Sequence, residues 1–415
     1  MPDKGLGMSA SNKGQVKTRR VFYIPGYDPT HPRRYRELYR REGAAQAKIS
    51  GYEIGLKPKA GKGNYGWRVD SQIDGRQVTS QVEVLVWSDI VRESMSNSIP
   101  ATYWQLLRTA WVYIGSGALW RLMRLRKGPV IAALYPVGML ILQALLAIAL
   151  GLLTYRALGV MTDHWAARLA FAAAGMGLGT ALLRWFKKKD GRFFAYYLMH
   201  DYAYSAATRG ANPPELEARM ERFGDDIAPA LAEDVDEVLV VGHSSGAHLG
   251  VSVLADLIRA GRVPEHGPAL GFLSLGQVVP MVSFLPRADR LRADLRYLST
   301  RDELAWVDVT APGDGCAFAL CDPVSVSGVA PDGKRWPLVF SAAFTQTLSP
   351  ARWKALRWRF FRLHFQYLCA FDRPGDYDYF QITAGPQTLA ARYDGRPASK
   401  SRINHAVSKY TSVAA

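Results

Sequence analysis

The first hundred residues predict several strands and one helix from their pattern of apolar and polar positions. Residues 20–27 (RVFYIPGY) are rich in β-branched and aromatic side chains and end in Pro-Gly, which predicts a buried strand followed by a tight turn. Residues 29–49 favour a polar helix with apolar side chains on one side. Residues 51–80 alternate and are rich in glycine, which predicts short strands or loops. Residues 82–87 (VEVLVW) predict a further strand.

Two long apolar runs follow. Residues 130–153 contain no charged side chain and are long enough, at ~1.5 Å per residue, to cross a hydrocarbon core of ~30 Å. Residues 165–183 are interrupted only by Arg168, whose side chain can reach the membrane interface. The glycines of GMGLG at 175–179 would let two helices approach closely. We therefore predict a transmembrane helical hairpin at residues 129–186, the alternative being two buried helices of a soluble core.

The hairpin is flanked by basic residues on both outer sides. Residues 101–128 combine Trp and Leu with many arginines, which favours a basic amphipathic segment at the membrane interface over an ordinary core-facing helix. Residues 184–189 are also basic, whereas the link between the two apolar runs is nearly neutral. The positive-inside rule then predicts a multi-pass protein of a bacterial-type inner membrane, with both termini and the remaining domain in the cytoplasm.

The chain returns to α/β character after the hairpin. Residues 193–231 predict helices with a break at Asn212-Pro213-Pro214, and residues 236–262 predict a strand, a sharp turn and a helix. Further strands are expected at 270–275 and 304–309. The expected fold class is therefore α/β, a mostly parallel sheet flanked by helices, with the hairpin inserted between its early and late strands.

Composition restricts the class of protein further. A formal net charge of +16 favours anionic partners, either nucleic acid or the cytoplasmic face of a membrane. The basic flanks of the hairpin already explain much of this excess, and because no nucleic-acid motif is present we expect membrane lipids as partners and no nucleic acid. The three cysteines, Cys316, Cys321 and Cys369, suit a reducing compartment, and their spacing predicts no metal site.

The main chemical signal is the pentapeptide Gly242-His243-Ser244-Ser245-Gly246. The bare pattern G-x-S-x-G is weak, but here an apolar strand at 238–241 enters it and an amphipathic helix at 247–258 leaves it. A nucleophile elbow requires this context, in which a serine occupies a strained turn and the N–H groups of the helix N-terminus point at developing negative charge. The alternative is a tight turn with a helix-capping serine.

This stretch resembles the α/β-hydrolase family, in particular its lipase- and esterase-like members. The resemblance covers about residues 20–87 and 236–387, and leaves out the hairpin and both ends of the chain. It implies a triad in the order serine, acid, histidine, in which the histidine takes the proton of the serine hydroxyl and the acid orients the histidine. Ser244 is then the expected nucleophile.

His364 is the best candidate for the general base. Of the other histidines after the elbow, His248 belongs to the elbow's own helix, His266 to a loop and His405 to the C-terminal segment. The segment around His364 resembles the H-x-x-Y segments that carry the catalytic histidine in some lipase-like hydrolases. A histidine in the core or on a helix surface is the alternative.

Asp314 is the favoured acid, because it lies in a Pro-Gly loop after the strand at 304–309, where the family places its acid. Asp322 is the main rival, and Asp308 lies inside the strand. The resemblance also implies an oxyanion hole, which we assign to the backbone N–H of Ser245 and an N–H of the loop after the first strand.

That second donor stays open between Gly26 and Tyr27. Many relatives carry His-Gly at this loop, whereas this chain has Pro25-Gly26, and Gly26 could serve only as a turn residue.

We therefore expect a membrane-anchored serine hydrolase that cleaves a small-molecule or lipid ester without metal or organic cofactor. The alternatives are an acyltransferase with the same triad and a non-catalytic membrane scaffold. The expected regions are a flexible basic tail (1–19), the first part of the domain (20–100), the interfacial segment (101–128), the hairpin (129–186), the second part of the domain (187–390) and a flexible tail (391–415).

Overall fold

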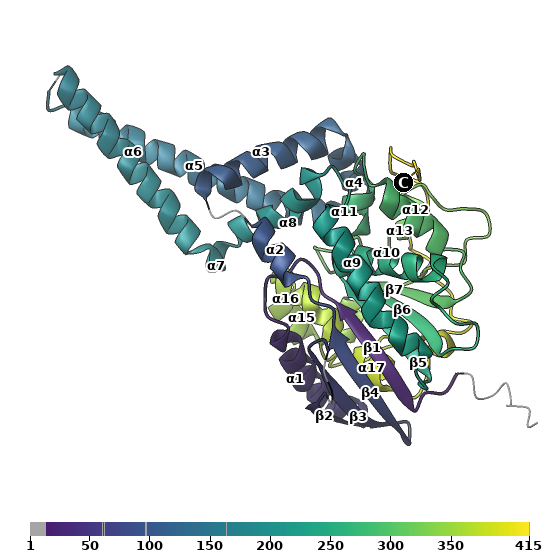
Figure 1. The fold of residues 1–415 in the computed structure, drawn as a ribbon. Helices are drawn as coiled ribbons and strands as arrows, with labels where there is room; N and C mark the ends of the chain where they lie inside the picture. Colours follow the sequence, from purple (N-terminus) through teal and green to yellow (C-terminus); the bar gives the residue numbers. More distant parts are fainter. Residues whose placement is uncertain (1–13, 60, 62, 96–97, 163, 415) are drawn as a thin grey trace, which may run out of the picture.

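An eight-stranded sheet lies at the centre of the computed structural model (Figure 1). The described residues are 14–59, 61, 63–95, 98–162 and 164–414. The strands are β1 (Thr18–Ile24), β2 (Glu53–Pro58), β3 (Gly66–Ile73), β4 (Arg76–Val84), β5 (Glu237–His243), β6 (Ala269–Leu275), β7 (Leu304–Thr310) and β8 (Leu338–Ser341). The predicted early strand at 82–87 is the end of β4, and β8 was not predicted.

The strand order is β2-β3-β4-β1-β5-β6-β7-β8. In this order, the six strands β4, β1, β5, β6, β7 and β8 run parallel, whereas β3 is antiparallel to both of its neighbours. After β1 the chain builds β2–β4 on one side, and it then crosses to place β5 on the other side of β1. In open α/β sheets ligands bind beyond the carboxyl ends of the strands at such a reversal. The loops after β1 and β5 are therefore where a site is expected.

Helices cover both faces of the sheet. The helices before β5 are α1 (Arg33–Ser50), α2 (Ser88–Ser94), α3 (Ile99–Gly115), α4 (Ala118–Leu125), α5 (Lys127–Gly159), α6 (Trp165–Lys188), α7 (Asp190–Phe193), α8 (Ala195–Ala207), α9 (Pro214–Ile227) and the 3₁₀ helix η2 (Ala228–Ala232). Those after it are α10 (Gly246–Arg259), α11 (Val279–Ser283), α12 (Asp289–Leu298), α13 (Pro323–Val326), α14 (Phe344–Thr347), α15 (Pro350–Leu356), α16 (Phe360–His364), the 3₁₀ helix η3 (Phe365–Leu368), α17 (Tyr379–Ala384) and α18 (Leu389–Arg392).

The two faces of the sheet belong to two hydrophobic cores, because successive strand residues point to opposite sides. In β1, Val21 and Tyr23 pack in the core that includes α1 and α17, whereas Phe22 and Ile24 pack in the core that includes α9, α10 and α12. All seven residues of β5 are buried. This is the pattern of a strand covered by helices on both sides, and it explains why the apolar run at 238–241 was recognisable from sequence.

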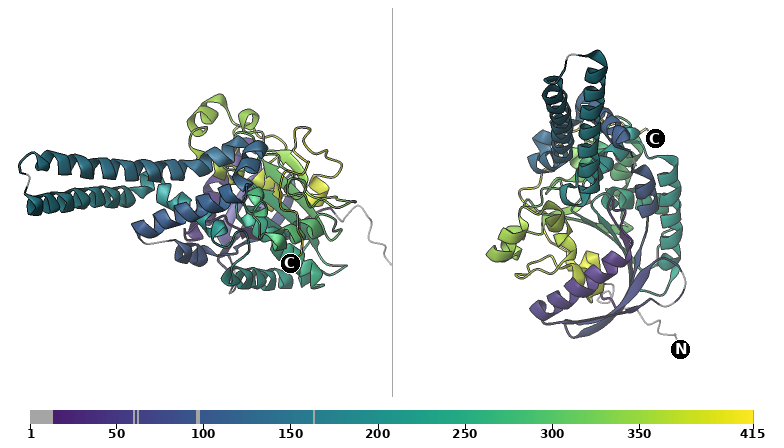
Figure 2. Two further views of the ribbon diagram at one scale, coloured as in Figure 1. Left: turned by 90° about the horizontal axis from the view of Figure 1, so that it is seen from above. Right: turned by 90° about the vertical axis from the view of Figure 1, so that its left-hand side faces the viewer.

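Helices α5 and α6 form a long pair that projects from the sheet-bearing body in all three views (Figures 1 and 2). They have 33 and 24 residues, and both are long and apolar enough to cross a membrane. The base of α5 packs on α3 and α8 through the buried Leu140. The insertion between early and late strands is confirmed, since α2–α9 separate β4 from β5.

Two of the three glycines of GMGLG bring α5 and α6 together. A Cβ atom on Gly175 would lie 2.5 Å from the carbonyl oxygen of Gly151, and one on Gly179 would lie 2.8 Å from that of Ala147. Gly177 has no atom near its Cβ position. The close approach predicted from this segment is therefore confirmed for one face of α6, and Gly177 lies on another.

The segment at 101–128 is two helices and not one. Gly117, with φ of 75°, separates α3 from α4. The solvent-facing side of α3 carries Trp104, Leu107 and Trp111, which are 60–80% exposed. An apolar helix face of this kind is unusual on a protein surface in water, and it fits the predicted interfacial position.

Both terminal segments differ from the expected flexible tails. Residues 1–13 of the predicted tail at 1–19 lie outside the described residues, but Val16 is buried and donates its N–H to Pro386 O. The region at 391–415 packs along the domain: Ile403 exchanges backbone hydrogen bonds with residues 320–322. Its polar composition misled the prediction, because it is held mainly through its backbone.

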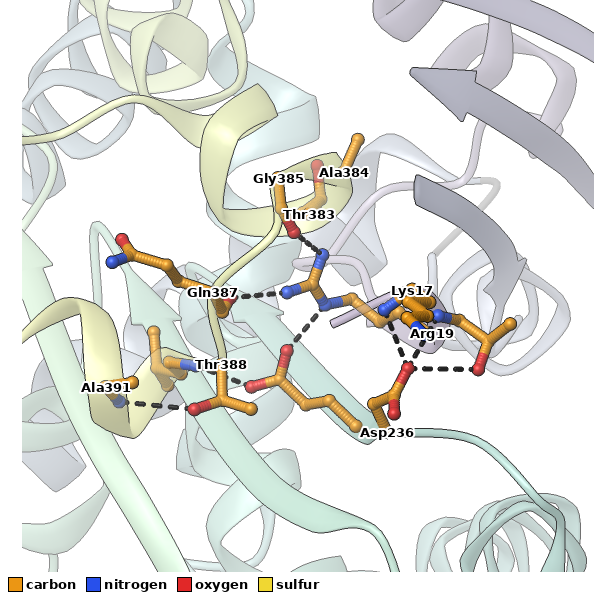
Figure 3. A network of polar contacts seen from close by, with 12 residues as sticks. Lys17, Arg19, Asp236, Thr383, Ala384, Gly385, Gln387, Thr388 and Ala391 are labelled. Atoms are coloured by element: carbon orange, nitrogen blue, oxygen red, sulfur yellow. Dashed lines mark hydrogen bonds and ion pairs between the residues drawn. The ribbon is translucent and has the colours of Figure 1, made fainter. Parts of the chain in front are cut away.

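A buried ion pair at the amino ends of β1 and β5 binds the backbone of residues 385–387, between α17 and α18 (Figure 3). Arg19 Nε lies 2.5 Å from Glu237 Oε2, and the guanidinium also donates to the carbonyl oxygens of Gly385 and Gln387. Nearby, Asp236 accepts hydrogen bonds from the N–H groups of Lys17, just before β1, and Thr18, its first residue. Each polar atom of the buried guanidinium has a partner, as burial of a charge requires.

Candidate active site

Ser244 occupies a strained turn at the carboxyl end of β5. Its φ is 57°, a left-handed conformation that costs a non-glycine residue about 1–3 kcal/mol and that is concentrated at functional sites. β5 ends one residue before Ser244, and α10 begins two residues after it. The strand–turn–helix context predicted around Ser244 is therefore confirmed.

The two glycines of the motif are required by close backbone contacts. A Cβ atom on Gly242 would lie 2.6 Å from Gly246 O, and one on Gly246 would lie 2.1 Å from Ile24 O. Gly26, in the loop after β1, is also in close contact, since a Cβ atom on it would lie 2.9 Å from the Cβ of Ser244 and 3.3 Å from its Oγ. The loop after β1 thus meets the serine directly.

Gly246→Ala is expected to destabilise the fold by about 3 kcal/mol, because the methyl group would force α10 away from the end of β1. Gly115→Ala is the matched control, since no atom of the described residues lies within 4 Å of its Cβ position. The measurement is denaturant unfolding of the detergent-solubilised protein. Equal midpoints for the two variants would contradict the close contact.

His364 and Asp314 form a buried pair next to this turn. Asp314 lies in the loop after β7, and His364 is the last residue of α16. His364 Nδ1 lies 2.8 Å from Asp314 Oδ2, and both residues are at most 6% exposed. Because Nδ1 donates to the carboxylate, Nε2 is left as the acceptor of the ring. Nε2 is buried and has no partner among the described residues.

Asp314 is itself fixed by two further donors. The Tyr367 hydroxyl lies 3.0 Å from Asp314 Oδ2, and the N–H of Cys316 lies 2.9 Å from Oδ1. The oxygen of Tyr367 also accepts the N–H of Ala311 at 2.9 Å. Tyr367 was not assigned this role from sequence, although its spacing from His364 is that of the H-x-x-Y segment noted there. Such contacts hold the orientation of the carboxylate and so of the imidazole.

His364 contacts His243, the residue before Ser244, both through its backbone carbonyl and through its ring. His243 Nε2 is 3.0 Å from His364 O, and the two rings are 4.8 Å apart between centroids. Burial and the neighbouring His364 lower the pKa of His243 to about 3, so it stays neutral. On the other side, a Cβ on Gly276 would lie 3.1 Å from His364 Cε1, and the residue before it, Leu275, accepts the N–H of Ser244.

The Ser244 hydroxyl is partly exposed and has no hydrogen bond within the described part of the chain. The backbone N–H groups of Ser245, Gly26 and Tyr27 likewise make no hydrogen bond to other described residues. Ser245 directly precedes the first residue of α10, so its N–H belongs to the donor-rich helix terminus. These donors are free to bind a negative charge next to Ser244.

The other acidic residues considered from sequence have different partners. Asp322 caps α13 by accepting the N–H groups of Val324 and Ser325, and it pairs with Lys334 at 2.6 Å. Asp308 is buried within β7, where burial raises its pKa to about 8 and its Oδ1 lies 2.6 Å from Ser274 Oγ. The structure therefore brings Asp314, and not these two, to His364.

A further carboxyl group, that of Asp201 on α8, faces the site and was missed from sequence. Burial raises its pKa to about 7, and the electrostatic interaction with His364 acts in the opposite direction. Asp201 lines a small cavity together with Ser245 and His248. The helical region at 193–231 carries no motif that could have singled it out.

One group of possible metal ligands occurs among the described residues. Ligand atoms of Asp314, Cys316 and His364 lie within 4.8 Å of one another. The carboxylate oxygens of Asp314 already accept three hydrogen bonds, including the one from His364 Nδ1. The burial that surrounds Cys316 raises the pKa of its thiol well above the usual value, which disfavours the thiolate that metals bind. The donor set thus fits a histidine–carboxylate pair better than a metal centre.

Comparison of the chain with models of known protein families, with curated proteins and with solved structures finds no match. What the fold and the site define directly is an α/β protein with a mixed sheet, two apolar helices long enough to cross a membrane, and a serine, a histidine and an aspartate gathered at the strand reversal.

Proposed function

We propose that this protein is a membrane-anchored serine hydrolase of the α/β-hydrolase fold that cleaves carboxylic esters. The observation that carries the proposal is the position of Ser244. It occupies a strained turn at the end of the central strand, beside a buried His364–Asp314 pair. The free ring nitrogen of this pair, Nε2, makes no hydrogen bond to any residue that the structure describes. A serine hydroxyl becomes a nucleophile when such a base takes its proton.

The arrangement of the chain supports this fold. The serine lies between a parallel strand and the helix that follows it, and the acid and the histidine come later in the chain in the order serine, aspartate, histidine. This is the order of α/β-hydrolases, which differs from the orders found in the chymotrypsin and subtilisin folds. The strand reversal at β1 and β5 places the serine where ligands bind in open α/β sheets.

The first half of the reaction is acyl transfer to the enzyme. As Ser244 Oγ attacks the ester carbonyl carbon, His364 Nε2 takes the hydroxyl proton, and the imidazolium that forms is stabilised by Asp314. The imidazolium then gives its proton to the departing alcohol. The hydroxyl–imidazole hydrogen bond has to form as substrate binds, which is common because such bonds are often long before that.

The second half is hydrolysis of the acyl-enzyme. A water molecule loses its proton to His364 Nε2 as its oxygen attacks the acyl carbon, and Ser244 recovers its proton when the acid leaves. In both halves the carbonyl oxygen becomes negative, and the N–H of Ser245 with that of Gly26 or Tyr27 would bind it. Each such donor contributes about 3 kcal/mol to stabilisation of the transition state.

Membrane anchoring is proposed from three features. Helices α5 and α6 are long and apolar enough to span a bilayer, and few of their residues are buried in the protein. The exposed face of α3 carries tryptophans at the base of the hairpin. The basic residues before α5 and at the end of α6 would then lie on the cytoplasmic side, together with the catalytic domain.

Labelling with a fluorophosphonate probe tests the proposed function. Wild-type protein in native membranes is expected to be labelled, because the probe reacts with serines that an adjacent base activates. Ser244→Ala is expected to abolish labelling, and Ser245→Ala to retain it, since the Ser245 side chain is buried and makes no hydrogen bond to other described residues. Labelling is read by in-gel fluorescence against equal amounts of protein.

Two outcomes would contradict the proposal. Unlabelled wild-type protein would mean that no activated serine is present. Equal labelling of wild type and Ser244→Ala would mean that the activated serine lies elsewhere in the chain.

A further inference from the structure

An apolar cavity of about 120 Å³ lies between the base of the hairpin and the candidate active site. Its walls come from α3, α4, the first turns of α5, α8 and α11, and from the loop after β7. None of the described side chains that line it is charged. Because an unpaired polar group would be costly in such surroundings, the cavity suits an apolar guest.

One end of this cavity reaches the histidine–aspartate pair. Cys316 lines the cavity, and its Sγ lies within 4.8 Å of ligand atoms of both Asp314 and His364. Its N–H is bonded to Asp314. A group held in the cavity next to Cys316 is therefore close to the histidine–aspartate pair.

The other end reaches the surface of the first proposed membrane helix. Val130, Leu134 and Val137 of α5 line the cavity. Val130 is fully buried, whereas Leu134 is 43% exposed. The neighbouring Ile131 is exposed as well. The wall of the cavity therefore continues into the apolar surface that would lie at or in the bilayer.

We infer that this cavity binds the acyl chain of the ester substrate, a fatty acyl chain that comes from the membrane leaflet along α5. The inference rests on the proposed function and specifies its substrate class. The volume is close to that of a cavity of about 150 Å³ that binds benzene, so about six carbons are enclosed. The remainder of a longer chain passes Leu134 toward the lipid.

The charge around the cavity fits a substrate with an apolar chain and a polar end. Next to the cavity, on the other side of Pro129, lies an open cleft. Most of its lining is apolar, but Arg126 and Arg357 also line it. The chain of one ester can thus lie in the cavity while its polar part lies beside the two arginines of the cleft. Soluble esters with short chains would leave the apolar cavity empty and forgo its contribution to binding.

Alkyl fluorophosphonates with two-carbon and ten-carbon chains test this inference on the full-length protein in membranes. Wild type is expected to react at least tenfold faster with the ten-carbon probe. Ala133→Phe places a ring in the cavity from α5, and it is expected to remove this preference while the rate with the two-carbon probe stays within about twofold. Ala132→Phe, on the same helix but not part of the lining, is the matched control and is expected to keep the preference.

The outcomes separate the two proposals. Labelling of Ser244 by both probes, with the same chain-length preference in Ala133→Phe as in wild type and Ala132→Phe, would overturn the acyl site and leave the hydrolase proposal standing. If neither probe labelled the wild-type protein, both the acyl site and the hydrolase proposal would be overturned. A preference lost equally in Ala132→Phe and Ala133→Phe would place the chain outside the cavity, on the surface of α5, and would also overturn the inference.

Discussion

Replacement of either Ser244 or His364 by alanine is expected to lower kcat/KM for an ester substrate by about 10⁴- to 10⁶-fold. Without the serine hydroxyl no acyl-enzyme can form, and without the imidazole the hydroxyl loses the base proposed to take its proton. In His364→Ala we do not expect Asp314 to act as the base, because its two oxygens still accept hydrogen bonds from the Tyr367 hydroxyl and the Cys316 N–H. The measurement is hydrolysis of a chromogenic ester by purified, detergent-solubilised protein.

The double variant Ser244→Ala/His364→Ala is expected to be no slower than the slower single variant, because residues that act as one unit have strongly non-additive effects. His266→Ala is the control, since this histidine lies in the exposed loop before β6, at the opposite end of the parallel strands from Ser244. Effects of the two single variants that multiply in the double variant would show that Ser244 and His364 act independently.

Asp314→Asn is expected to lower kcat by about 10³- to 10⁴-fold with little loss of stability, because the amide is nearly isosteric but presents an N–H group to the imidazole. His364 would then carry its proton on Nε2, the nitrogen that must accept the proton of Ser244. Steady-state hydrolysis of an ester measures kcat, and thermal unfolding in detergent measures stability.

Asp322→Asn is the matched comparison, since it makes the same chemical change at the rival acid. It keeps a residue that caps helices well, but it removes the charge opposite Lys334. We expect activity within about threefold of wild type and a lower unfolding midpoint. If Asp322→Asn lost the activity and Asp314→Asn kept it, the assignment of the acid would be wrong.

The local part of the site was predictable, because its signals are local. Ser244 is preceded by an apolar strand and followed by an amphipathic helix, and both glycines of its motif are needed within five residues. The long apolar helices and the helical region after them were predictable for the same reason, since their patterns extend over many residues.

The rest of the site depends on contacts between segments far apart in the chain. The sequence left Asp314 and Asp322 open because both follow β7, and only their partners, His364 for one and a helix terminus with Lys334 for the other, separate them. Asp201 reaches the site from a helix of the insertion, which no motif marks. The choice between Gly26 and Tyr27 stays open, because a backbone N–H leaves no trace in the side-chain pattern.

The ordered domain is larger than predicted in two places, at the edge strand β8 and at the C-terminal segment 391–415. Four-residue β8 is too short to show a period, and the segment at 391–415 is held by backbone hydrogen bonds to residues such as Val326 and not by an apolar pattern. Polar composition alone therefore does not identify a flexible tail when the segment adds its backbone to an existing core.

The position of the hairpin between β4 and β5 has a consequence for biogenesis. Strand β1 pairs on one side with β4, which is synthesised before the hairpin, and on the other side with β5, which is synthesised after it. During translation one edge of β1 therefore stays unpaired while the helices of the insertion are made, and an open apolar strand edge invites aggregation. If the hairpin enters the bilayer at that stage, it holds each nascent half-sheet at the membrane, away from other copies in solution, until β5 arrives to close the sheet.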